Sequence, residues 1–408
     1  MSEYLTCSLP GTTGILGPSP DDFFVEEIPL YLPCGEGEHL YLTVEKQGLT
    51  TFDLLNRTAQ ALGVRERELG YAGLKDARAV TRQTISIPGI DPETGFALDL
   101  PGVRVLAAQR HTNKLRPGHL AGNRFRIRIY DTCSDAEQRA ADILAVLGDI
   151  GVPNRFGRQR FGVLGNSHRI GRALVQKEYQ VAIDEIVGDP ERIKHSGWQA
   201  AAIAYRKDDY RLAIQSFPRH CRNERNLLER LVSGQPPGKA VLAMPRKLLR
   251  LYLSAYQSFL FDRILAMRMD SIGQLWQGDL AYKHDNGACF FVDNPAEEQP
   301  RANDFAISPS GPLFGYKMRL AQGQAGLLEQ ALLDKDMLQT DNFRLGKGLS
   351  MEGARRPLRV PLVGASLQTL DKGLELEFQL PKGSFATAVL HEIMKCQSDD
   401  ERLAGGLQ

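Results

Sequence analysis

The pattern of apolar and polar positions changes twice along the chain. Up to about residue 160, segments with the alternation typical of strands (23–32, 38–48 and 82–89) are interspersed with segments of helical periodicity (50–64 and 134–151). This succession of strands and helices predicts an α+β or α/β domain.

The segment 50–64 carries the start and stop signals of a helix. A threonine precedes it as an N-cap, and a glycine follows its last strongly apolar position. Its apolar residues at helical spacing, which we expect to form the buried face, are Phe52, Leu55, Ala59 and Leu62.

The clearest strand is GNRFRIRIY, residues 122–130, in which three apolar residues alternate with three arginines. The apolar residues are Phe125, Ile127 and Ile129, and the arginines are Arg124, Arg126 and Arg128. One face is therefore expected to be core and the other a row of guanidinium groups. These arginines either form cross-strand salt bridges on a solvated face or contact phosphates.

From about residue 167 to 357 the pattern is mainly helical, with 245–269 as its longest periodic run and Gly/Pro-rich loops such as SPSGPLFGY, 308–316. A strand at 374–380 and a helix starting at Ser384 follow. Because a lone strand–helix pair cannot bury its own apolar face, we expect it to complete the N-terminal sheet. The middle segment is then an insertion into a discontinuous domain.

Composition agrees with a folded protein of two or three domains, since the 408 residues include 42% hydrophobic and 24% charged residues. No apolar run reaches the roughly 18 residues of a membrane span, and the start lacks the pattern of a signal peptide. We therefore expect a cytoplasmic protein. The six cysteines and eight histidines have no metal-binding spacing, so no metal site is predicted.

Basic residues are concentrated even though the net charge is only +1. Residues 101–130 and 151–177 contain no acid but many arginines and lysines. Two such blocks in a nearly neutral protein indicate a surface that faces a polyanion.

The Gly-rich segment GYAGLKDARAVTRQTISI, residues 70–87, contains Asp76 next to Lys75. An aspartate in such a connection is most often a turn residue. It is also a carboxylate that can act as a nucleophile towards an activated carbon, with Lys75 holding it ionised or contacting phosphate. The residues alone leave both interpretations open.

The segment VPNRFGRQRFG, residues 152–162, interleaves arginines with phenylalanines. The candidate RNA-binding residues in it are Asn154, Arg155, Phe156, Arg158 and Arg160. Arginine for phosphates and phenylalanine for base stacking suit unstacked RNA, although the rings could equally be core. Phe23 and Phe385, each just after a turn, are either core residues or part of a site.

Six motifs, taken in order, resemble those of the TruD family of tRNA pseudouridine synthases. They are SPDDFFVEE, GEGEHLYLTVEKQGLTT, YAGLKDARAVTRQ, GNRFRIRI, VPNRFGRQRFG and LPKGSFATAVLHEI. The resemblance implies a pseudouridine-synthase fold with a mixed, mainly antiparallel sheet and flanking helices, interrupted by a largely helical insertion domain. It places the catalytic domain at 1–166 plus 357–408 and the insertion domain at 167–356.

The resemblance also implies the site. Asp76 matches the catalytic aspartate that isomerises uridine to pseudouridine without metal or organic cofactor, in tRNA, at position 13 of the D-arm by family analogy. Phe23, Asn154 and Phe385 match positions around the target uridine, and Phe156 matches a stacking aromatic. No obligate protein partner is implied.

One departure stands out. Members of the family often carry a lysine or arginine shortly before the P-x-D-F motif, whereas GILGPSPDDF, residues 14–23, has none. Arg78 and Arg155 are candidate substitutes. A non-catalytic RNA-binding or tRNA-folding protein on the same scaffold is the alternative hypothesis, and a glycoside hydrolase is a weaker one because no second acid is paired with Asp76.

Overall fold

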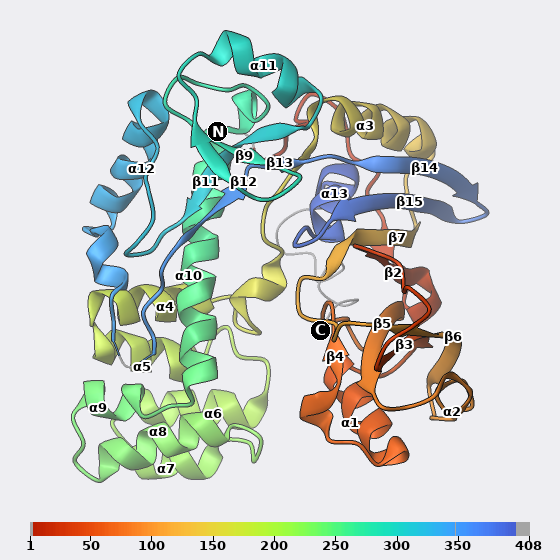
Figure 1. Ribbon diagram of the computed structural model, residues 1–408. Helices are drawn as coiled ribbons and strands as arrows, with labels where there is room; N and C mark the ends of the chain where they lie inside the picture. Colours follow the sequence, from red (N-terminus) through yellow and green to blue (C-terminus); the bar gives the residue numbers. More distant parts are fainter. Residues whose placement is uncertain (1–2, 347, 397–408) are drawn as a thin grey trace. The chain divides into compact units, whose positions relative to one another are not determined.

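The computed structural model describes residues 3–346 and 348–396, which form two compact units (Figure 1). The sheet unit comprises Tyr4–Val152 and residues 360–396, and the helical unit comprises Pro153–Arg359 with Glu3. The chain passes between the units within β8 (Val152–Pro153) and β13 (Arg359–Val360). The boundaries expected for the functional domains, at 166 and 357, stay a prediction.

The sheet unit contains a nine-stranded sheet with the order β14-β15-β7-β2-β5-β3-β6, to which β1 adds on β7 and β4 on β5. The strands are β1 (Ile15–Leu16), β2 (Phe23–Pro29), β3 (His39–Lys46), β4 (Gly70–Tyr71), β5 (Val80–Pro88), β6 (Val103–His111), β7 (Leu120–Tyr130), β14 (Val363–Leu370) and β15 (Gly373–Pro381). The β2–β5 pair is parallel and the other pairs are antiparallel. The expected mixed, mainly antiparallel sheet is confirmed.

The helices of this unit are α1 (Thr51–Leu62), α2 (Pro92–Phe96), α3 (Ala136–Ile150) and α13 (Ala386–Met394), with short 3-10 turns η1 (Pro20–Asp22) and η2 (Glu66–Glu68). One hydrophobic core joins α3 and α13 to β7 and β15. A second joins α1 to β3 and β5. The helix expected from Ser384 begins instead at Ala386, with Phe385 as its N-cap.

The predicted buried face of α1 was partly wrong. Phe52 is exposed, and the buried residues are Thr51, Leu54, Leu55, Thr58 and Ala59. These positions also repeat at helical spacing, and they place two threonines inside. The helix face predicted from the apolar residues alone is therefore rotated by part of a helical turn from the face that is buried.

The C-terminal strand completes the N-terminal sheet, as expected, because β15 pairs with β7 along its whole length, from Gly373 opposite Tyr130 to Pro381 opposite Gly122. The domain that contains this sheet is thus discontinuous in sequence.

The helical unit contains α4 (Ser167–Gln176), α5 (Tyr179–Val187), α6 (Ser196–Arg206), α7 (Tyr210–Ser216), α8 (Arg222–Val232), α9 (Pro237–Leu242), α10 (Arg246–Met267), α11 (Pro295–Asn303) and α12 (Gly323–Lys335). Short 3-10 turns are η3 (Arg158–Phe161), η4 (Met269–Ser271) and η5 (Thr340–Phe343). The long helix α10 packs on α4, α12 and β11 (Figure 1).

A four-stranded antiparallel sheet, β10-β9-β11-β12, lies in the same unit. Its strands are β9 (Leu280–Lys283), β10 (Cys289–Phe291), β11 (Ile307–Leu313) and β12 (Ala354–Pro357). The expectation that residues 308–316 form a loop was wrong for β11, a central strand with two prolines. Proline cannot donate a backbone hydrogen bond to a neighbouring strand and is rare in central strands. The two prolines therefore led to the prediction of a loop instead of a strand.

Candidate active site

Asp76 lies in the loop between β4 and β5 of the sheet unit and is partly buried. Its carboxylate Oδ1 accepts a hydrogen bond from the backbone N–H of Arg78 at 3.0 Å. This local turn bond is the one that an aspartate in a connection typically makes, and it fixes one carboxylate oxygen. Oδ1 is thereby engaged by the chain itself.

The backbone of this loop is bound at three successive residues by the end of β3, the start of α1 and the connection between them. The N–H of Lys75 donates to Thr51 Oγ1 at 2.8 Å, and the N–H of Gly48 donates to the carbonyl oxygen of Ala77 at 2.9 Å. Between them, the ammonium of Lys46 donates to the carbonyl oxygen of Asp76 at 2.9 Å. The loop that carries Asp76 is therefore held in one conformation rather than being a free surface turn.

Lys75 forms a buried ion pair. Its Nζ lies 3.1 Å from Glu27 Oε1, with both side chains only 6% exposed, and it donates to Asn123 Oδ1 at 2.7 Å. Burial lowers the pKa of Lys75, against the opposing attraction of Glu27. Burial likewise raises the pKa of Glu27, although the Lys75 charge and the Thr84 N–H counteract it. The ammonium of Lys75 thus anchors the loop to β2 and β7.

The two phenylalanines of the sheet unit differ in environment. Phe23, the first residue of β2, is partly buried and packs against the core that includes α3 and α13. Phe385, the N-cap of α13, is 39% exposed. The side chain of Phe385 is therefore more exposed to solvent than that of Phe23.

The arginine row on β7 is mostly neutralised by acids on neighbouring strands. Arg124 lies 3.5 Å from Glu26 and 3.7 Å from Glu377, and Arg128 lies 2.7 Å from Glu375. Arg126 instead lies over the ring of Phe24, 5.1 Å from its centroid, and no ion pair of Arg126 is found within the described part of the chain. The cross-strand salt bridges considered from the sequence are thus present at two of the three arginines.

The helical unit brings Asn154 and Phe156 together around Arg356. Asn154 is 3% exposed and its amide donates to the carbonyl oxygen of Pro357 at 3.0 Å. The Arg356 guanidinium donates to the backbone oxygen of Asn154 at 3.1 Å and to its Oδ1 at 2.5 Å. The same guanidinium lies 4.3 Å from the centroid of the Phe156 ring. Both polar ends of the Asn154 side chain are therefore engaged by the protein.

The other arginines of this segment have different surroundings. Arg160 donates to Ser258 Oγ at 3.1 Å and to Ser254 Oγ, and burial lowers its pKa. Arg155 donates to the carbonyl oxygen of Glu3 at 2.6 Å, whereas Arg158 is exposed. The predicted site residues are thus divided between the two units: Phe23, Lys75, Asp76, the β7 arginines and Phe385 belong to the sheet unit, and Asn154 to Arg160 belong to the helical unit.

Asp262 on α10 accepts the backbone N–H of Phe156 at 2.9 Å. Burial raises the pKa of this carboxyl to about 7, and the hydrogen bond and the charges of Arg155 and Arg356 only partly oppose the rise. A carboxyl whose pKa is higher in the folded chain than its ordinary 3.8 takes up protons on folding. Its ionised form therefore costs stability, and this cost grows from about pH 4 to 7 and then stays constant.

We accordingly expect Asp262→Asn to be more stable than the wild type at pH 8, because asparagine keeps an oxygen acceptor for Phe156 and cannot ionise. The difference should shrink as the pH falls and vanish near pH 4. Melting temperatures of both proteins measured from pH 4 to 8 test this. A difference that is the same at every pH would mean that ionisation of Asp262 is not its cause.

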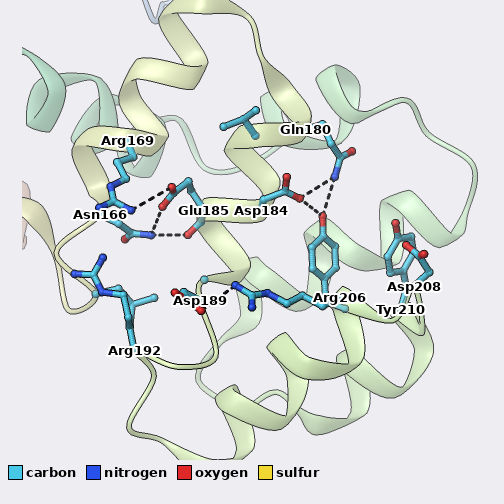
Figure 2. Close-up of a pocket in the computed structure, with 14 residues that line it drawn as sticks. Asn166, Arg169, Gln180, Asp184, Glu185, Asp189, Arg192, Arg206, Asp208 and Tyr210 are labelled. Atoms are coloured by element: carbon cyan, nitrogen blue, oxygen red, sulfur yellow. Dashed lines mark hydrogen bonds and ion pairs between the residues drawn. The ribbon is translucent and has the colours of Figure 1, made fainter.

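A polar pocket of about 630 Å³ lies among α4, α5, α6 and α7 of the helical unit (Figure 2). Several of its polar groups pair with one another: Arg206 lies 2.8 Å from Asp189, Arg169 lies 3.6 Å from Glu185, and Tyr205 donates to Asp184 at 2.6 Å. None of the predicted site residues lines it. The pocket is therefore not the site that the sequence indicates.

Residues 3–346 and 348–396, which the structure describes, contain no group of three or more His, Cys, Asp or Glu side chains placed to hold a metal ion. Nor do they include a helix with the length and apolar character needed to cross a membrane. The six cysteines all lie in this part of the chain, and none of them forms a disulfide bond.

Sequence reasoning missed four residues that shape these groups: Lys46, Glu27, Asp262 and Arg356. Two of them left a signal. Lys46 continues the alternation of Leu40, Leu42 and Val44 on β3, so a lysine stands where the pattern demands an apolar residue. Asp262 is the only acid in α10. A charged residue at a position where the pattern predicts a buried apolar residue is thus a candidate site residue.

Comparison with known proteins agrees with this picture. The model of the family "TruD: tRNA pseudouridine synthase D" matches residues 1–393. A tRNA pseudouridine synthase D of Syntrophotalea carbinolica is 58% identical over 97% of this chain and 99% of its own length. That of Geobacter sulfurreducens is 52% identical over 97% of each chain.

A crystal structure from Methanosarcina mazei, described as tRNA pseudouridine synthase D, superposes with a TM-score of 0.83 and 26% identity over 97% of both chains. Fold and comparisons together define the class of the protein, an enzyme that acts as an isomerase. The chain belongs to the TruD family of tRNA pseudouridine synthases. The resemblance and fold class predicted from the sequence are confirmed.

Proposed function

We propose that the protein isomerises uridine to pseudouridine at position 13 of the tRNA D-arm, with Asp76 as the nucleophile. The observation that carries the proposal is the position of Asp76 in the loop matching the family's catalytic motif. Hydrogen bonds of Lys46, Gly48 and Thr51 with the backbone of residues 75–77 hold this loop. A surface turn would not need such support, whereas a nucleophile must be held in place.

The reaction rearranges one glycosidic bond. The N1–C1′ bond breaks and its electron pair leaves with the uracil, which turns while still bound. Carbon C5 then bonds to C1′, the proton on C5 is lost, and N1 takes up a proton, so atoms and electrons balance without an added reagent. The Asp76 carboxylate either captures C1′ or assists formation of a glycal, and both routes need an anion next to the sugar.

The remaining residues fit binding of an extruded base. Unstacking a nucleotide costs a few kcal/mol, and stacking on aromatic rings compensates for it. The partly exposed Phe385 is a candidate for such a contact, and so are Phe23 and Phe156. Asn154 is a candidate only through the family resemblance, because both ends of its amide are already bound within the protein. Lys75, bound to Glu27, acts in this proposal by holding the loop and not by contacting phosphate.

Release of tritium from tRNA labelled at C5 of uridine tests the proposal with the purified protein. We expect one tritium per tRNA to be released, since one C5–H bond is lost per isomerisation. A transcript with cytidine at position 13 should release none. Release that is unchanged in this transcript would move the target elsewhere, and absence of release from any tRNA would favour the non-catalytic RNA-binding alternative.

The β7 arginines yield a separate prediction about tRNA affinity. Arg126 is the one whose charge is not offset by an ion pair in the described structure, whereas Arg128 lies 2.7 Å from Glu375. If this face binds tRNA, Arg126→Ala should lower the slope of log affinity against log salt by about one, as expected for one lost phosphate contact. Arg128→Ala should lower it less. Equal slopes for wild type and Arg126→Ala would remove this face from the RNA-binding surface.

A further inference from the structure

Lys46 occupies a position where a charged side chain is costly. It is the last residue of β3, it follows Leu40, Leu42 and Val44 on the face of the strand that packs against α1, and it is only 1% exposed. Burying an ammonium group is unfavourable unless hydrogen bonds and opposite charge compensate. An apolar residue here would continue the pattern of the strand.

The compensation comes from two backbone carbonyl oxygens, one in the β3–α1 connection and one in the loop that carries Asp76. Lys46 Nζ donates to the carbonyl oxygen of Leu49 at 2.6 Å and to that of Asp76 at 2.9 Å. No carboxylate lies within ion-pair distance of Lys46 in the described part of the chain, unlike Lys75, which is paired with Glu27. The ammonium of Lys46 is thus buried, hydrogen-bonded to the Asp76 backbone, and without a carboxylate at ion-pair distance in the described residues.

The charged groups that face Lys46 come from three elements. They are Asp76 and Lys75 on the loop, Asp53 on α1 and Glu27 on β2. Among the carboxylates, Asp76 attracts the Lys46 charge most strongly. The Glu27 charge is already shared with Lys75, and Asp53 accepts hydrogen bonds from Thr50 at the helix start.

We propose that Lys46 is a positioning residue that fixes the Asp76 backbone and supplies the positive charge that stabilises its carboxylate during the reaction. This inference rests on the proposed role of Asp76 as the nucleophile. It also gives a source for a cation near Asp76 in a chain without a basic residue in the GILGPSP segment, residues 14–20.

A rise in pH can remove the charge of Lys46 without removing its hydrogen bonds. Burial lowers the pKa of this ammonium to about 8, with Asp76 opposing the change. The neutral amine still has two N–H groups, enough for the carbonyl oxygens of Leu49 and Asp76, so loss of the proton removes the charge and keeps both hydrogen bonds. Activity should therefore fall as the pH rises through about 8.

The free energy of unfolding should rise, and not fall, as the pH increases through this range. The pKa of Lys46 is lower in the folded chain than its ordinary value of 10.5. Between these two values the unfolded chain binds more protons, so a rise in pH favours the folded state through this group. A fall in kcat above pH 8 without a fall in melting temperature is thus the signature of Lys46, and alkaline unfolding would not produce it.

The test compares the pH dependence of kcat and KM for tRNA in wild type, Lys46→Gln and Lys395→Gln. Lys395 is the matched control, because its ammonium also donates to two backbone carbonyl oxygens of the sheet unit, those of Thr6 and Leu9. We expect Lys46→Gln to lower kcat at pH 7 by roughly ten- to a hundredfold, to leave KM unchanged and to lack the alkaline fall. Lys395→Gln should keep the wild-type profile.

A Lys46→Gln protein that is folded and shows the wild-type profile would overturn the inference. If this variant does not fold, the wild-type profile decides: a fall in kcat near pH 8 without a fall in melting temperature supports the inference, and its absence overturns it. Activity that persists in Asp76→Asn would instead overturn the proposed function itself, so the two failures are distinguishable.

Discussion

Asp76→Asn is expected to abolish pseudouridine formation and to leave folding and tRNA binding intact. Asparagine has nearly the same size and keeps an oxygen to accept the Arg78 N–H, which Asp76 Oδ1 accepts at 3.0 Å. Its amide is neutral and is not a nucleophile, so the step that needs an anion at C1′ is lost. We expect a loss in kcat of about four orders of magnitude or more, measured as conversion of labelled uridine to pseudouridine in tRNA.

A matched control uses another loop carboxylate of the same unit. Asp91 also accepts a backbone N–H through its side chain, that of Thr94 at 2.8 Å, but it caps α2. Asp91→Asn should therefore retain wild-type activity. Equal tRNA affinity of both variants would show that the defect of Asp76→Asn is in chemistry, whereas substantial turnover by Asp76→Asn would remove this residue from its role.

Glu27→Ala is expected to have the largest effect on stability. It leaves the ammonium of Lys75 buried without its partner at 3.1 Å and exposes the loop of Asp76 to rearrangement. Removing one member of a buried ion pair typically costs about 3–5 kcal/mol in the free energy of unfolding. Urea unfolding of the variant should show this loss, and activity should fall with it because Lys75 no longer anchors the loop.

Two further variants identify the cause of that loss. Arg65→Ala removes an exposed pair of the same unit, in which Arg65 lies 3.9 Å from Glu68, and should cost less than about 1 kcal/mol. The double variant Glu27→Leu with Lys75→Met has no buried charge left to satisfy and should recover part of the stability. A double variant less stable than Glu27→Ala would show that the unpaired ammonium is not the main cost.

Much of the fold could be predicted because its signals are local. Alternation on GNRFRIRIY, residues 122–130, predicts one buried face, and β7 has it. The cap signals of α1 place its start at Thr51 and its end before Gly63, as found. The return of the chain at 374–380 to the first sheet followed from the need to bury a face.

What the sequence could not predict depends on contacts between distant residues. The salt bridges of Arg124 and Arg128 require the strand neighbours that bring Glu26, Glu375 and Glu377 opposite them. The buried ion pair of Lys75 with Glu27 joins residues far apart in sequence, and the sequence around each of them contains no pattern that predicts the pair. The polar network around Asn154 and Arg356 likewise forms only when residues 154 and 356 meet.

Mapping of pseudouridine in cellular tRNA tests the role of the Asp76 carboxylate and the identity of the target uridine at once. Carbodiimide-dependent stops of reverse transcription are compared in cells that lack the gene and in cells complemented with wild type, Asp76→Asn or Asp91→Asn. We expect a stop at position 13 with wild type and Asp91→Asn, and none without the gene or with Asp76→Asn. A stop at position 13 that persists with Asp76→Asn would contradict the account.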